Sequence, residues 1–133
     1  MEKMNSIAQA GRLLAAFLAG VCATPAAGLA QSSDEVQAAR YAQCMNLAET
    51  APDEALEQAQ TWADLGGSDP ARHCAAVSLL RLGHFVAAGQ ELEALAATLE
   101  PAYVQLQIPI LIQAAQAWFA AGDVDRAYAV QTA

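Results

Sequence analysis

The stretch "SDPARHCAAVSLLRLGHFVAAGQEL" (residues 68–92) has the pattern of two short helices joined by a tight turn. Ser68 and Asp69 are residue types that cap helix N-termini, and Pro70 is favoured in a first helical turn. Gly83 then interrupts the apolar pattern, as glycine does at helix ends. The stretch therefore predicts one helix that reaches Leu82 and a second that begins at His84.

Similar breakers divide the rest of the chain into helix-sized segments. Pro52 suits a first helical turn, Gly66-Gly67 and Gly122 suit helix ends, and Asp123 suits an N-cap. The composition is 56% hydrophobic but only 6% aromatic, and alanine, the best helix former, supplies most of the apolar residues. We expect six helices, at residues 36–49, 55–65, 70–82, 84–99, 103–121 and 123–133.

A pattern of glycine, a polar residue, an apolar residue and then alanine recurs along these segments. "LGHFVAAGQEL" (82–92) aligns with "AGDVDRAYAVQ" (121–131), and "APDEALEQA" (51–59) supplies a third copy. Ala55, Ala88 and Ala127 share one slot, at spacings of 33 and then 39 residues. The longer spacing falls at "PAYVQLQIPIL" (101–111), where Pro109 marks either the first turn of a helix or a kink.

This helix–turn–helix period, with small residues at its slots, resembles the tetratricopeptide repeat. The slots of the repeat's first helix hold Arg72, Ala75, Ala76 and Leu79 in the middle copy. The resemblance implies an all-α fold, in which antiparallel helix pairs stack as a short right-handed α-solenoid. It covers residues 36–133 with about three repeats, of which the last ends early, and it implies a binding architecture without a fixed chemistry.

The first thirty residues differ from the repeats. Lys3 and Arg12 precede an apolar run, "LLAAFLAGVCA" (13–23), and small residues at Gly28 and Ala30 precede a polar segment. This order is typical of a secretory signal peptide. We expect a signal peptide at residues 1–30, cleavage after Ala30, a polar lead-in at residues 31–35, and a periplasmic rather than a secreted protein.

Two alternatives concern the same segment. A membrane anchor would need an apolar run that spans about 30 Å of hydrocarbon, and the run at residues 13–23 is too short. A lipid-anchored protein would use Cys22, but Val21 stands where a small residue is expected before such a cysteine. After cleavage we therefore expect no association with the membrane.

The charge of the chain is strongly acidic. It carries six lysine and arginine residues against fourteen aspartate and glutamate residues, a formal net charge of −8. Removal of residues 1–30 takes away Lys3, the single lysine, so arginine becomes the only cation of fixed charge. Nucleic acids and anionic membrane surfaces require basic patches, so this composition argues against both as partners.

Two cysteines, Cys44 and Cys74, remain after the expected cleavage. Each lies in the first helix of a repeat, and such helices are neighbours in the stack, so a disulfide is feasible. It would close a loop of about 31 residues and stabilise the fold by roughly 3–4 kcal/mol. Two buried free thiols and a reactive thiol are the alternatives, and an even pair of cysteines in an exported chain favours the disulfide.

Residues that suggest catalysis or metal binding are few. Cys44, His73, Cys74 and His84 are the candidate soft ligands, but adjacent His73 and Cys74 suit one tetrahedral zinc ion poorly. In a helix their side chains diverge by about 100°, so they do not form a nucleophile–base pair either. With no phosphate-binding loop or nucleophile motif, we expect no enzyme, no cofactor and no metal.

The remaining expectation is a binding surface. In tetratricopeptide-like stacks the first helix of each pair lines a concave groove that accepts peptides. Our register places the following residues in this groove: Arg40, Leu47, His73, Val77, Leu80, Arg81, Ile112, Gln116 and Phe119. We therefore expect a scaffold for a protein or peptide partner whose identity stays open. The alternative is a structural or oligomerisation module, a homo-oligomer or the first segment of a longer solenoid in an envelope assembly.

Overall fold

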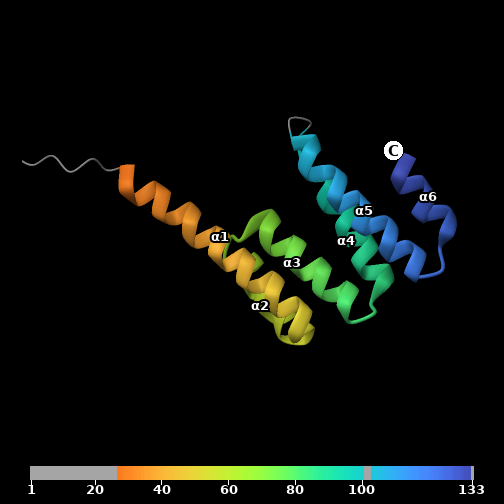
Figure 1. Cartoon of the computed structure of the whole chain (residues 1–133), viewed down its shortest axis with the longest axis horizontal. Helices are drawn as coiled ribbons and strands as arrows, with labels where there is room; N and C mark the ends of the chain where they lie inside the picture. The colour runs from red at the N-terminus through yellow and green to blue at the C-terminus, as the bar shows by residue number, and fades with distance from the viewer. Residues whose placement is uncertain (1–26, 101–102, 133) are drawn as a thin grey trace, which may run out of the picture.

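The computed structural model describes residues 27–100 and 103–132 and side chains from residue 33 onward. Within these ranges the fold is all-α, with helices and no strand (Figure 1). The helices are α1 (Ala27–Thr50), α2 (Pro52–Asp64), α3 (Ser68–Arg81), α4 (Phe85–Thr98), α5 (Val104–Ala120) and α6 (Val124–Thr132). None of these helices is both long and apolar enough to cross a membrane.

Three glycines end helices, as the sequence predicts. Gly66, Gly83 and Gly122 have φ angles of 90°, 79° and 82°, in the left-handed region that residues with a Cβ avoid. Asp123 is confirmed as a cap, because its Oδ1 accepts the backbone N–H of Arg126 at 3.0 Å. Pro52 lies in the first turn of α2, also as expected.

The start of α3 differs from the prediction. Gly67 is the N-cap, and neither Ser68 nor Asp69 caps the helix through its side chain. Ser68 has a φ of 47°, and its hydroxyl donates backward to the Gly66 carbonyl at 3.4 Å. The Trp62 ring determines this turn, since a Cβ on Gly67 would lie 2.5 Å from Trp62 Cδ1. The backbone therefore lies directly on the indole.

Two further boundaries differ from the expected ones. Helix α1 begins at Ala27, so the expected lead-in at residues 31–35 is helical. The expected signal peptide lies mostly in residues 1–26, outside the described residues, and α1 runs through Ala30. Pro109 lies inside α5, which excludes the reading that it marks the first turn. Proline lacks the N–H that would bond the carbonyl of Gln105.

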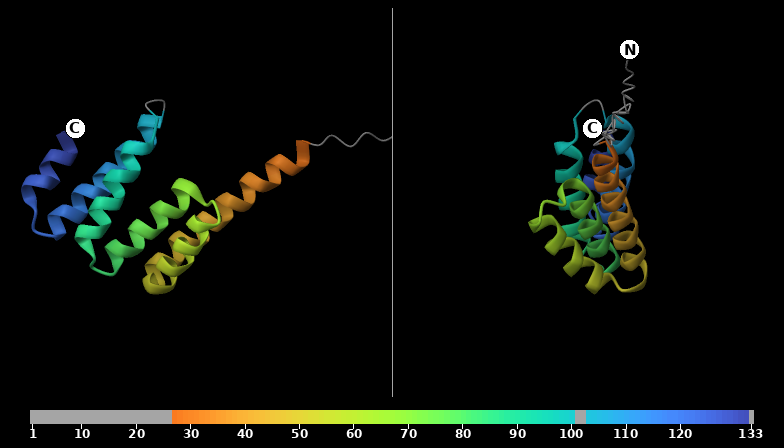
Figure 2. Two further views of the ribbon diagram at one scale, coloured as in Figure 1. Left: turned by 180° about the vertical axis from the view of Figure 1, so that it is seen from behind. Right: turned by 90° about the vertical axis from the view of Figure 1, so that its left-hand side faces the viewer.

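Each helix packs against its neighbour in the chain, so the helices form an elongated array from α1 to α6 (Figures 1 and 2). Helix α1 contacts α3 as well as α2. Small residues allow this close approach: Ala55, Ala59, Ala71, Ala76, Ala88 and Ala114 are fully buried. The core is divided along the array, with Trp62 in the cluster of α1–α3 and Trp118 in the cluster of α3–α6.

Candidate binding site

Residues of α1, α3, α4 and α5 line an open hollow of about 370 Å³. We call it the central hollow. Its walls are apolar and come from all four helices: Ala38, Pro70, Leu95, Leu99, Leu106, Pro109 and Ile110. Its polar lining residues are Gln37, Tyr41, Asp69, His73 and Gln113. A mostly apolar hollow with a few convergent polar groups is typical of a binding site.

A hydrogen-bonded relay crosses the central hollow from α1 through α3 to α5. His73 Nε2 lies 2.7 Å from Gln113 Oε1, and Nδ1 lies 2.7 Å from the Tyr41 hydroxyl. Because an amide oxygen only accepts, Nε2–H donates to Gln113, and in the neutral imidazole Nδ1 accepts the hydrogen of Tyr41. Both ring nitrogens of His73 are therefore occupied within the protein.

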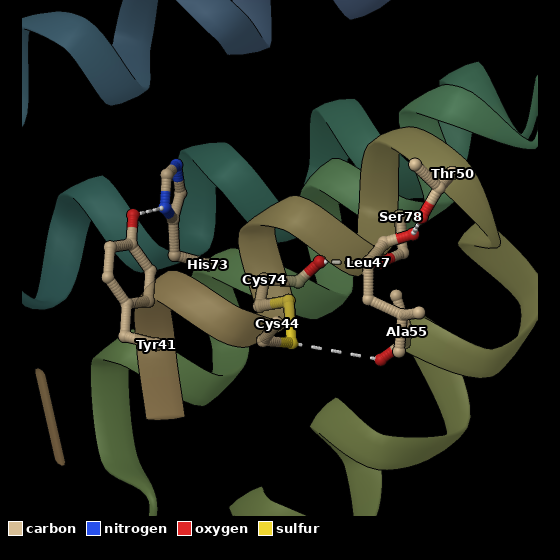
Figure 3. Close-up of a disulfide and its surroundings, with 8 residues drawn as sticks. All are labelled: Tyr41, Cys44, Leu47, Thr50, Ala55, His73, Cys74 and Ser78. Atoms are coloured by element: carbon tan, nitrogen blue, oxygen red, sulfur yellow. Dashed lines mark hydrogen bonds between the residues drawn. A yellow bond between two sulfur atoms is a disulfide. The ribbon is translucent and has the colours of Figure 1, made fainter. Parts of the chain in front are cut away.

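The disulfide lies directly beside this relay. Cys44 and Cys74 are joined, with their Cα atoms 6.2 Å apart, so the predicted bridge between α1 and α3 is confirmed. Tyr41 lies three residues before Cys44 and His73 immediately before Cys74, and the Tyr41 hydroxyl points at the His73 ring on one side of the disulfide (Figure 3). The bridge thus holds together the two helices that carry the first half of the relay.

Burial affects Tyr41. The ring is partly buried against His73, with the ring centroids 5.9 Å apart. This burial raises the pKa of the Tyr41 hydroxyl above its ordinary value of 10.0, because a phenolate is poorly solvated there. At neutral pH the hydroxyl therefore keeps the hydrogen that it donates to His73.

Of the residues predicted to line a groove, His73 lines the central hollow, whereas Arg40 and Ile112 do not. Their neighbours Tyr41 and Gln113 line it in their place. One residue along a helix rotates the side chain by about 100°, so a register error of one residue moves it to another face. Arg40 instead lies over the Trp62 ring, 5.1 Å from its centroid, on the side of α2.

Other predicted groove residues on α1 and α3 support the packing. Val77 is only 4% exposed and packs with Ala48 and Ala55, so it contributes to the core and does not line the central hollow. Leu47 packs against the same cluster and Leu80 is half-buried. Arg81 is exposed and forms an ion pair with Glu49 of α1, outside the residues that line the central hollow.

The predicted residues of α5 face the opposite end of the array. Gln116 and Phe119 line a separate hollow against α6, and Ile112 lines a third, so none of them reaches the central hollow. The reason is again rotation, since these side chains lie about 60–120° around α5 from Gln113. The structure thus separates residues that our register placed in one groove.

Sequence reasoning missed Tyr41 and Gln113. Gln113 could have been identified because it is a polar residue within the apolar run "PILIQAA" (109–115). A polar side chain in such a run needs a hydrogen-bond partner when it is buried. Tyr41 precedes Cys44 by one helical turn, so it belongs to the face that meets α3. The expected bridge could therefore have supplied the correct register.

Metal ligands are not gathered at this site. Among the described residues no group of three or more His, Cys, Asp or Glu side chains could hold an ion. Cys44 and Cys74 are engaged with each other, and His84 lies exposed at the N-cap of α4. No protein-family model, curated protein or solved structure matches this chain.

Proposed function

We propose that this protein is an exported, tetratricopeptide-like scaffold that binds a segment of a partner protein in the central hollow. The observation that carries the proposal is the hollow of about 370 Å³ itself, which is lined by residues of α1, α3, α4 and α5. Its volume lies in the range of ligand sites, and its walls favour an apolar side chain. A binding scaffold needs no reacting groups, which agrees with a histidine whose nitrogens are both engaged.

Export to the periplasm is part of the same proposal. A disulfide between Cys44 and Cys74 is compatible with an oxidising compartment. The N-terminal sequence pattern supports export independently. Stacking of the helix pairs as a right-handed solenoid is likewise proposed, on the sequence resemblance and on the consecutive packing of the helices.

Selection of peptides on the oxidised protein tests this function. The whole chain is expressed with export, purified without reductant, and used to select binders from a displayed library of random peptides. Leu106 is 57% exposed and lines the hollow, so Leu106→Ser should weaken the selected peptides about tenfold without unfolding the chain. Phe119→Ser is the matched control, because Phe119 is 68% exposed but lines another hollow.

Calorimetric titration of each selected peptide gives the deciding result. Equal affinities for the wild type and Leu106→Ser, or failure to select any peptide, would contradict the proposed site. A loss of affinity in Phe119→Ser alone would move the binding site to α6.

Self-association is the second candidate function, and exposed apolar side chains favour it. Phe119 and Tyr128 are 68% and 72% exposed, and both line the hollow between α5 and α6. Large exposed aromatic residues are characteristic of interfaces. Sedimentation over a range of concentrations tests this, since Phe119→Ser should abolish any dimer that forms through this surface.

A further inference from the structure

The central hollow also indicates which kind of segment it accepts, an inference that depends on the proposed function. The inner part of the site requires an apolar group. Both nitrogens of His73 already have partners, Tyr41 on one side and Gln113 on the other. A ligand carboxylate would find neither a free imidazole N–H nor a lysine or arginine among the lining residues. Burying such a charge without a cationic partner is costly, so an anionic group is disfavoured.

The rim of the hollow has the opposite property. Asp69 lines it, and Asp34 lies one helical turn before Ala38, a lining residue of α1. By helical periodicity Asp34 falls on the same face as Ala38 and Tyr41. Asp34 is exposed and pairs with no cation among the described residues, whereas Asp69 lies 3.7 Å from Arg72. Asp34 therefore adds a negative charge, unpaired within the described part of the chain, to the face of α1 that carries Ala38 and Tyr41.

The whole chain reinforces this local charge. Its formal net charge is −8, and acidic side chains outnumber basic ones by more than two to one. A field of this sign raises the association rate of cationic segments and repels anionic ones. The local and the overall charge thus favour the same class of partner.

We propose that the central hollow binds an extended, basic segment of a partner protein, with one bulky apolar side chain in the hollow and a lysine or arginine beside Asp34. Asp34 precedes Ala38 by four residues, a rise of about 6 Å along α1. An extended peptide advances about 3.4 Å per residue. The basic residue therefore lies about two positions from the apolar anchor.

Matched synthetic peptides test this proposal on the oxidised, exported protein. Each peptide has a glycine–serine background and a central leucine, methionine, phenylalanine or tryptophan. The positions two and three residues from this anchor are lysine, glutamine or glutamate, and a further lysine peptide has serine in place of the anchor. Fluorescence anisotropy gives each affinity at low and at physiological salt.

We expect the lysine peptides to bind about tenfold more tightly than the glutamate peptides, with a difference that shrinks as salt rises. Asp34→Asn should reduce the preference for lysine while it leaves the glutamine peptides unchanged. Glu57→Gln is the matched control, since Glu57 is exposed on α2 and lines a different hollow. Leu106→Ser should weaken every anchored peptide equally.

The outcomes separate this inference from the function on which it depends. If glutamine or glutamate peptides bind as tightly as lysine peptides, the basic segment is wrong and the binding scaffold stands. If the peptide without an anchor binds equally well, attraction to the surface charge alone overturns the inference. If no anchored peptide binds to protein whose helical circular dichroism is intact, the proposed function itself fails.

Discussion

Reduction of the disulfide between Cys44 and Cys74 should remove a large part of the stability of this protein. The two half-cystines are 30 residues apart in sequence and are the covalent link between α1 and α3. Both side chains are buried, at 4% and 0% exposure. The perturbation is the addition of a phosphine reductant under denaturing conditions, followed by refolding with the reductant present.

The expected loss follows from the length of the closed loop. In the chain-entropy estimate, a loop of 30 residues restricts the unfolded chain by about 3.6 kcal/mol at 25 °C. Domains of this size have total stabilities of roughly 5–15 kcal/mol. The reduced protein should therefore still fold, with its free energy of unfolding lower by about 3–4 kcal/mol.

Urea unfolding followed by circular dichroism measures this loss in the oxidised and reduced protein. The two free energies at zero denaturant should be compared, because the cross-link also makes the unfolded state more compact and so changes the slope. The double variant Cys44→Ala/Cys74→Ala is the control and should not respond to reductant. Its stability should lie near that of the reduced wild type.

Hydrogen exchange gives the local part of the prediction. Apart from the disulfide, α1 is held by buried side chains such as Ala48 and by Gln37, whose Oε1 accepts a hydrogen bond from Trp62 Nε1 at 3.1 Å. Reduction should therefore accelerate amide exchange in α1 more than in α4 and α5. A change in the free energy of unfolding below about 1 kcal/mol would refute the chain-entropy reasoning. Uniform acceleration across all helices would refute the assignment of the bridge to the anchoring of α1.

Three further changes test particular contacts. Gly89→Ala should destabilise the protein, because the new Cβ would lie 2.7 Å from Trp118 Cε2. The destabilisation from overpacking, about 1–3 kcal/mol, exceeds the gain in helix propensity. A higher melting temperature would contradict this prediction. Leu92→Ala should lower the free energy of unfolding in urea by about 2–5 kcal/mol, since Leu92 is fully buried, and a loss below about 1 kcal/mol would place it outside the core. Burial raises the pKa of Tyr41, so the folded state holds the phenolic proton more tightly than the unfolded state does. The stability that Tyr41 contributes through this proton is complete below pH 10.0 and declines as the pH rises through the folded pKa. In melts at rising alkaline pH, Tyr41→Phe should therefore lose stability less steeply than the wild type, and parallel curves would show that Tyr41 is solvated.

The fold could be read from the sequence because its determinants are local. Gly66, Gly83 and Gly122 need left-handed backbone, and this requirement is visible in the residue type. Helix ends fell within about two residues of their expected positions, except at the starts of α1 and α2. For α2 the sequence predicted Pro52 in a first turn, although the expected range began at residue 55. The disulfide was also foreseeable, because the N-terminal pattern predicts export, and an even pair of cysteines is expected to form a disulfide in an exported protein.

The central hollow could not be derived in the same way, because its lining depends on the rotation of each helix about its axis. The alignment of the repeats placed His73 in the same register as Arg40 and Ile112. In the folded protein, however, His73 lies between Tyr41 and Gln113. An offset of one residue barely affects a pattern of small alanines, yet it turns a side chain by about 100°. Composition and spacing thus determined that this chain forms paired helices joined by a disulfide. Only the packing of α1 and α5 against α3 decided which side chains meet, because the energy of close packing depends on side-chain shape across helices far apart in sequence.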